Sequence, residues 1–314
     1  MQDPIVIAGM ARTPIGNFQG AFTGVPATAL GSHAIKAALE RGGVKASDVD
    51  EVFMGCVLPA GLGQAPARQA SLGAGLPPSA GCVTVNKVCG SGMKTLMMAH
   101  DAIAAGSIRV AVAGGMESMT NAPHILPTGR TGIKFGHGEI LDHMAYDGLE
   151  DAYRKRTAMG VFAEKCAREW QFSKAEQDEY SMRSVTRAQK AIKDGKFRGE
   201  IAPYEVQTRK GAVTVADDEK PGTVDAAKIP SLKPAFEKDG TVTAGSSSAI
   251  SDGAAALVVM RESEAKKRGA KAIARVVAHA THSQEPEWFT TAPVDSIKSV
   301  IAKAGWSVSD VDLI

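Results

Sequence analysis

The sequence predicts an α/β protein whose first part is a largely parallel sheet covered on both faces by helices. Short apolar runs alternate with amphipathic, helix-like segments over residues 1–115, which is the pattern of repeated βαβ units. The alternation stops near Met116 and resumes at Ala254. The stretch between them is more charged and contains Pro and Gly throughout. We therefore expect an α/β fold that carries an inserted subdomain.

Composition and charge exclude several classes of protein. The 314 residues are enough for two domains, and with 44% hydrophobic and 22% charged residues a sizeable core is expected. The formal net charge of +2 gives no basic excess for nucleic acid. No apolar run approaches the length of about 18 residues that predicts a membrane span. The chain shows no targeting segment, which predicts a cytoplasmic protein, or an organellar one if the source is eukaryotic.

The cysteines argue against a metal site or a disulfide framework. Cys56, Cys82, Cys89 and Cys166 show neither CxxC nor Cys/His ligand spacing. We expect free thiols in a reducing compartment, no bound metal and no permanently bound cofactor.

The first four strands are predicted from short apolar runs that end in glycine or polar residues. They are expected at 5–10, 51–58, 82–88 and 109–115. Helices are expected between them at 27–40, 65–74 and from just after Cys89 to 105. Glycines at 42 and 43 supply the stop of the first helix.

The insertion contains one clear helix pair, at 160–170 and 174–194. Ser173 is the expected N-cap of the second helix, with Glu176 three residues later as in a capping box. Lysines near the end and Gly195 just after it favour termination there.

The remaining elements complete the first sheet and begin a second one. The apolar run 254–260 is expected to finish the first sheet, followed by a short helix at 263–268. A first strand of a second domain is expected at 272–280, a helix at 294–304 and the start of a strand at 310–314. Ser-Asp-Val-Asp occurs at 47–50 and again at 309–312, which is compatible with duplicated βα units but also with chance or a shared turn.

Cys89 is the main candidate for a catalytic residue. Gly90 and Gly92 follow it, and then Met93, Leu96 and Met97 recur at helical spacing. A thiol at a helix N-terminus is favoured as the reactive thiolate. The glycines permit a sharp turn and close approach of a substrate carbonyl to backbone N–H donors. The same local pattern also fits a buried structural cysteine.

The segment Asn-Lys-Val-Cys-Gly-Ser-Gly-Met-Lys at 86–94 resembles the nucleophile segment of thiolases, the acetyl-CoA acetyltransferase and 3-ketoacyl-CoA thiolase family. The resemblance implies that Cys89 takes an acyl group from acyl-CoA as a thioester, with coenzyme A as substrate or product. It also implies a layered αβαβα fold of two similar halves, the second incomplete in this chain. The implied parts are an N-terminal domain (1–118 and 246–268), an inserted loop subdomain (119–245) and the start of a C-terminal domain (269–314).

The small-residue stretch 241–253 is the second signature. By itself it fits either a loop that a ligand approaches closely or an ordinary turn, and it carries no phosphate-binding glycine motif. It resembles the thiolase loop along the pantetheine arm of coenzyme A, which implies that Ala244 and Ser248 bind substrate. Further residues matched to the pantetheine and acyl pocket, with ordinary core packing as the alternative, are Leu149, Met159 and Phe236.

Two other titratable residues, Glu117 and His143, are expected to have structural roles. Glu117 lies just after the strand expected at 109–115. A carboxylate could act there as a general base, but we favour a role as hydrogen-bonded scaffolding. His143 is expected in a surface loop.

The implied function is acyl transfer, by thiolysis of a 3-ketoacyl-CoA or by Claisen condensation of two acyl-CoA units, in fatty acid metabolism. A homodimer or homotetramer is implied, with acyl preference open. The family's Asn-Glu-Ala-Phe segment, Gly-His-Pro histidine and second cysteine would follow Ile314 and do not occur among the 314 residues. Two hypotheses follow: an enzyme whose 314-residue chain is inactive alone, or a catalytically incomplete protein that binds coenzyme A or forms oligomers.

Overall fold

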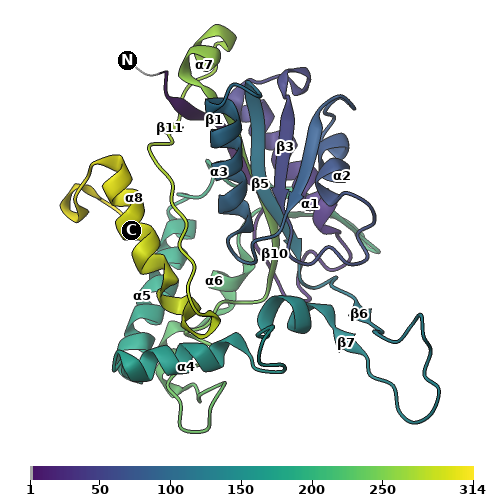
Figure 1. Ribbon diagram of the computed structural model, residues 1–314, viewed down its shortest axis with the longest axis vertical. Coiled ribbons are helices and arrows are strands. Elements are labelled where there is room, and N and C mark those ends of the chain that lie inside the picture. The colour runs from purple at the N-terminus through teal and green to yellow at the C-terminus, as the bar shows by residue number, and fades with distance from the viewer. Residues whose placement is uncertain (1–2) are drawn as a thin grey trace.

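A computed structural model describes residues 3–314 and centres on a seven-stranded sheet (Figure 1). The strand order is β11-β1-β10-β5-β3-β4, with β2 paired to β10. These strands are β1 (Ile5–Arg12), β2 (Gly16–Asn17), β3 (Glu51–Gly55), β4 (Gly81–Val85), β5 (Val110–Ser118), β10 (Ser251–Arg261) and β11 (Ala274–Arg275).

The sheet is mixed, which corrects the expectation of a largely parallel one. β3 pairs in parallel with both β4 and β5, whereas β10 runs antiparallel between β1 and β5. Because β10 is antiparallel to both neighbours, β1 points the same way as β5. The four main strands of the first 118 residues are thus parallel in direction, and the reversal comes from β10, which enters the sheet from its other end after the insertion.

Helices cover both faces of the sheet. α1 (Ala27–Gly42) and α2 (Pro66–Gly73) share one core cluster with Val52 and Met54 of β3. The intervening Phe53 packs into the second cluster, with Ala99 and Ile103 of α3 (Ser91–Ala104). This division follows from the two-residue side-chain period of a strand. Burying a side chain of this size stabilises the fold by about 1.5–3 kcal/mol.

The first helix ends as its sequence predicts. Gly43 adopts the left-handed region, with φ of 62°. Its N–H donates to the carbonyl of Glu40 at 3.2 Å, and the N–H of Val44 donates to the carbonyl of Leu39 at 3.0 Å. A residue without Cβ reaches this conformation at little cost. Because α1 stops there, the chain turns back into β3 through the short helix η1 (Ala46–Asp48).

The insertion lies beyond one end of the sheet and carries a hairpin arm, β6–β7, that extends away from it (Figure 1). The predicted capping box between Ser173 and Glu176 is present at the start of its longest helix. No helix in residues 3–314 is long and apolar enough to cross a membrane. The elements of the insertion are β6 (His124–Ile125), β7 (Leu141–Asp142), η2 (Ala145–Leu149), α4 (Met159–Glu169), α5 (Lys174–Lys193), β8 (Tyr204–Thr208), β9 (Gly211–Val215), α6 (Glu219–Thr223) and η3 (Ala226–Ser231).

Two strand predictions near the end of the chain are wrong. The strand expected at 272–280 is reduced to β11, and β11 pairs with β1 at the edge of the central sheet. Residues 310–314 form no strand, and a short 3-10 helix, η5 (Val308–Asp310), ends there. The backbone N–H and C=O groups of a strand need hydrogen-bond partners on a neighbouring strand. An apolar run in the sequence does not show whether such a neighbour exists. The other elements after β10 are α7 (Glu262–Arg268), η4 (Pro286–Thr291) and α8 (Ala292–Ala304).

Candidate active site

Cys89 lies in the tight turn between β4 and α3, and it is exposed. Gly90 is the N-cap of α3 and Ser91 its first residue, so the prediction that a helix begins soon after the thiol is confirmed. Val88 has a φ of 47°, a region that β-branched residues rarely adopt. This conformation bends the chain sharply just before the thiol.

Side chains of the turn hold this unfavourable backbone in place. Ser91 Oγ accepts the N–H of Lys87 at 2.8 Å and donates to the carbonyl of Val88 at 2.6 Å. Asn86 Oδ1 accepts the N–H of Val88 at 2.9 Å. The N–H groups of Gly90 and Ser91 donate to carbonyls within the turn, at 3.1 and 3.0 Å. These two amides are therefore committed to hydrogen bonds within the turn.

Glycines allow the start of α3 to sit against the sheet. A Cβ on Gly55 would lie 2.7 Å from Ser91 Cβ and 2.9 Å from Gly92 N. A Cβ on Gly115 would lie 3.5 Å from Gly92 Cα. The end of β3 must therefore be bare at Gly55 for the turn to occupy its place, whereas the distance at Gly115 is that of an ordinary van der Waals contact.

A cleft of about 290 Å³ opens at Cys89. Within the described part of the chain its lining contains three ionisable side chains, those of Arg12, Cys89 and Glu117, and no histidine. The lining residues come from the ends of four strands and the turn before α3: Arg12, Ile15, Gly55, Val57, Val88, Cys89, Ser91, Gly92, Gly115, Met116, Glu117, Gly253, Ala254 and Ala255.

Glu117 is hydrogen-bonded to the backbone after β3, as a scaffolding role predicts. Its two carboxylate oxygens accept the N–H groups of Val57 at 2.8 Å and Leu58 at 3.0 Å. Burial raises the pKa of Glu117 above its usual value, although these hydrogen bonds oppose the shift. Burial and the adjacent Glu117 carboxylate also raise the pKa of the Cys56 thiol to about 12. Cys56 is therefore locked as a neutral thiol beside the cleft.

His143 is buried, contrary to its expected place in a surface loop. Its Nδ1 lies 2.6 Å from Asp147 Oδ2, and its Nε2 accepts the N–H of Ala60 at 3.4 Å. These contacts fit the neutral tautomer that carries its proton on Nδ1. The sequence contains a signal for the first contact, because His143 and Asp147 are four residues apart. Nothing local indicates the second.

Arg12 joins the first strand to the insertion. Its Nη1 and Nη2 donate to the two carboxylate oxygens of Asp218 at 2.7 and 2.9 Å, and its Nε donates to Glu200 at 2.8 Å. A bidentate pair of this kind fixes orientation as well as distance. The Arg12 charge is thereby held by carboxylates at the rim of the cleft.

The five residues matched to substrate binding gather in the insertion and the loop after it. The bridge between Glu150 and Ala158 sets Leu149 opposite Met159, and a Cβ on Gly160 would lie 2.4 Å from the ring of Phe236. The bridge between Pro234 and Thr243 brings the Phe236 segment beside Ala244, which is exposed, as is Ser248. None of the five residues lines the Cys89 cleft in the part of the chain described.

Glu164 of α4 is 1% exposed, and its part in this region was not predicted from the sequence. Its carboxylate accepts the N–H groups of Thr241 and Val242. Glu164 lies three residues before the buried Ala167 on the same helix face, where a charged side chain needs a polar partner. That signal shows that Glu164 is unusual but does not identify the partner.

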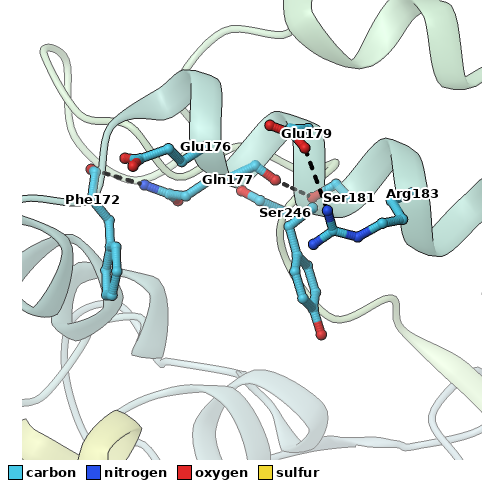
Figure 2. Close-up of a pocket in the computed structure, with 8 residues that line it drawn as sticks. Phe172, Glu176, Gln177, Glu179, Ser181, Arg183 and Ser246 are labelled. Carbon is cyan, nitrogen blue, oxygen red and sulfur yellow. Dashed lines mark hydrogen bonds and ion pairs between the residues drawn. The ribbon is translucent and has the colours of Figure 1, made fainter.

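A second hollow, of about 450 Å³, lies along α5 (Figure 2). Ser246 borders it from the loop after Thr241, opposite α5 side chains that include Gln177 and Tyr180. Gln177 Nε2 lies 3.4 Å from the carbonyl of Phe172, and Ser181 Oγ donates to the carbonyl of Gln177 at 2.8 Å. The same loop thus borders this hollow through Ser246 and leads on to Gly253 in the Cys89 cleft.

Comparisons with known proteins agree with this arrangement. Residues 5–263 match the family model described as the N-terminal domain of thiolase. The chain is 48% identical to an acetyl-CoA acetyltransferase of Rhizobium meliloti, covering 100% of this chain and 80% of that protein. It is 49% identical to acetyl-CoA acetyltransferase 2 of Arabidopsis thaliana, covering 98% and 77%.

Solved structures give the same result for the fold. A thiolase of Ascaris suum in complex with coenzyme A superimposes with a TM-score of 0.93 at 38% identity, covering 99% of this chain and 79% of that one. An acetyl-CoA acetyltransferase of Bacillus anthracis superimposes with a TM-score of 0.95, also at 38% identity, with the same coverage of 99% and 79%. The chain therefore belongs to the thiolase family.

Proposed function

We propose that this chain is a thiolase-type acyltransferase that holds an acyl group on Cys89 as a thioester and uses coenzyme A as the acyl carrier. The observation that carries the proposal is the exposed Cys89 thiol in a constrained turn at the start of α3, open to a cleft. Relatives named acetyl-CoA acetyltransferase, and a related thiolase solved with coenzyme A, support the choice of substrate class.

The first half-reaction needs only groups of this chain and acyl-CoA. The Cys89 sulfur attacks the thioester carbonyl, a new carbon–sulfur bond forms, and the bond to the sulfur of coenzyme A breaks. The thiol proton of Cys89 ends on coenzyme A. In Claisen condensation, a second acyl-CoA loses a proton from C2, the resulting carbanion takes the acyl group from the Cys89 sulfur, and a 3-ketoacyl-CoA forms. Thiolysis is the reverse: the Cys89 sulfur attacks the 3-keto carbon, the C2–C3 bond breaks, acetyl-CoA leaves after C2 takes up a proton, and the acyl group then passes to coenzyme A. Fatty acid metabolism is the setting that we propose for either direction.

The binding residues and the division of the chain belong to the same proposal. The pantetheine arm and the acyl group would be held by Leu149, Met159, Phe236, Ala244 and Ser248. The β-bridges that bring the segments of these residues together support this assignment. The domain division stays as in the sequence analysis, with 119–245 as the inserted subdomain, in a cytoplasmic protein.

A homodimer or homotetramer is the proposed assembly. β4 is an edge strand of the sheet, and Val83 on it is 36% exposed. An edge strand offers unpaired backbone groups to another chain.

Isotope exchange tests the first half-reaction alone. Acetyl-CoA and isotopically labelled coenzyme A are incubated with the protein, and label entering acetyl-CoA is measured. The wild type and a Cys82→Ala control should exchange label, whereas Cys89→Ala should not. Exchange that persists in Cys89→Ala would overturn the assignment of the nucleophile.

The second candidate is a protein that binds coenzyme A without catalysis. The cleft lining, in the part of the chain described, contains no histidine to act as a base, which favours this candidate. Binding of coenzyme A without any exchange in the wild type would select it.

A further inference from the structure

We propose that Glu164 is a positioning residue for coenzyme A: it fixes residues 241–248, here named the CoA loop, without contacting the ligand. This inference rests on the proposed function, because it takes Ala244 and Ser248 of the CoA loop as the binding residues. Glu164 belongs to α4, so the proposal links a buried helix position to the affinity of a surface loop.

The Glu164 carboxylate holds the first turn of the CoA loop with both oxygens. Oε1 accepts the N–H of Val242 at 2.7 Å and that of Thr241 at 2.9 Å. Oε2 accepts the N–H of Thr241 at 2.9 Å and its hydroxyl at 3.2 Å. Bonds from N–H groups to a carboxylate are about twice as strong as neutral ones. The start of the CoA loop is therefore fixed in position and direction relative to α4.

Burial makes these bonds obligatory. Glu164 is 1% exposed and Val242 is 5% exposed, so water does not replace a lost partner. A buried carboxylate is costly unless donors surround it. All hydrogen bonds that Glu164 accepts within residues 3–314 come from Thr241 and Val242. The charge is thus balanced by the loop itself.

Gly240 shows that the chain wraps the carboxylate closely. A Cβ at this position would lie 2.2 Å from Glu164 Oε1 and 2.7 Å from Glu164 Cδ. Only glycine lets the backbone pass at this distance. The residue before the CoA loop is therefore fitted to the same carboxylate.

A second contact fixes the CoA loop from α5. Gln177 Nε2 donates to Thr241 Oγ1 at 2.9 Å, and that hydroxyl donates onward to Glu164. Figure 2 shows Gln177 on α5 close to Ser246 of the CoA loop. Thr241 is thus held between two helices of the insertion.

The remainder of the CoA loop continues from this anchor by short-range bonds. Thr243 N–H donates to Ser246 Oγ at 2.9 Å, and Ser247 Oγ donates to the Thr243 carbonyl at 2.8 Å. Ala244 lies within this compact turn and Ser248 follows it, and both residues are exposed. A shift of Thr241 and Val242 is therefore passed to both binding residues.

The test is to measure by calorimetry the Kd of coenzyme A for the 314-residue wild type and for variants at Glu164. Glu164→Ala should raise the Kd about tenfold or more, because three donors lose a charged acceptor. Glu164→Gln keeps one carbonyl oxygen for Val242 and should restore most of the affinity. Glu169→Ala, an exposed acid on the same helix, is the matched control and should bind as the wild type does.

Two further measurements separate positioning from general damage. The rate of Cys89 alkylation by iodoacetamide should be unchanged in all variants, because the hydrogen bonds of Glu164 within residues 3–314 go to Thr241 and Val242 and not to the Cys89 turn. If Glu164→Ala does not fold, Thr241→Val removes only the hydroxyl link and should still weaken binding. If the wild type binds coenzyme A and Glu164→Ala or Thr241→Val binds it equally well, the positioning role is overturned. The proposed function would still stand. A wild type that does not bind coenzyme A would instead overturn the proposed function.

Discussion

Four cysteines of the same intrinsic chemistry occupy very different surroundings. Cys56 is buried beside a carboxylate, which raises its pKa to about 12 and keeps the sulfur protonated. Cys82 and Cys166 are half-buried, and Cys89 is exposed at the start of a helix. Thiol reactivity requires the thiolate and access to it. Position in the fold therefore selects Cys89.

Alkylation of the folded protein should follow this order. Limited treatment with iodoacetamide and peptide mapping should find Cys89 modified first and Cys56 last, because Cys56 is both shielded and held neutral. Labelling after unfolding in urea, where all four thiols are equally accessible, is the control. Modification of Cys82 or Cys166 ahead of Cys89 in the folded protein would count against the nucleophile assignment.

Glu117 should give the protein a measurable pH dependence. Burial raises its pKa above 4.5 in the folded state, so folding favours its protonated form. Its contribution to the free energy of unfolding is complete below its unfolded pKa and is lost as pH rises through the folded pKa.

Urea unfolding at a series of pH values tests this sign with Glu117→Gln. The stability of the wild type relative to the variant should fall as pH rises above 4.5, by at most about 1.4 kcal/mol per pH unit. Glu169→Gln, at an exposed position, should show no such trend. A difference that grows with pH would contradict the assignment.

At the scale of elements, caps and helices could be predicted because their causes are local. Gly43 ends α1, and Ser173 with Glu176 starts α5, as their sequence patterns indicate. The shortened strand at 272–280 could not be predicted, since pairing with β1 depends on residues far away in the chain. The burial of Glu164 and His143 could not be predicted for the same reason: their partners include residues about 80 positions away.

The contact between α3 and the sheet yields a prediction at this scale. Gly55→Ala should destabilise the protein by about 1–3 kcal/mol, the usual cost of overpacking, because the new methyl group would meet Ser91. Cys89 alkylation should also change in rate, since Ser91 holds the turn before α3.

The matched control is Gly199→Ala, because a Cβ there would meet nothing within 4 Å. Thermal unfolding and labelling kinetics should leave this control close to the wild type. A Gly55→Ala variant with unchanged stability and an unchanged labelling rate would show that close packing at Gly55 does not set the turn.

At the scale of the whole molecule, the sequence predicts the α/β class, the insertion and the nucleophile, while the mixed sheet depends on topology. β10 reads as an apolar strand in either direction, so its antiparallel place between β1 and β5 follows only from the folded chain. The same holds for the site. The Cys89 turn is predictable because its causes are local, whereas the ion pair of Arg12 with Asp218 is not, because it joins residues 206 positions apart. The chain spans 80% of the length of the Rhizobium meliloti relative.

Formation of the thioester on Cys89 can be measured directly. The 314-residue protein is incubated with acetyl-CoA, quenched in acid and analysed by intact mass and peptide mapping, with Cys89→Ala treated in parallel. We expect one acetyl group per chain, carried by Cys89 as a thioester that hydroxylamine removes, and none on the variant. An unmodified wild-type protein that still binds coenzyme A, or acetylation at another residue, would contradict it.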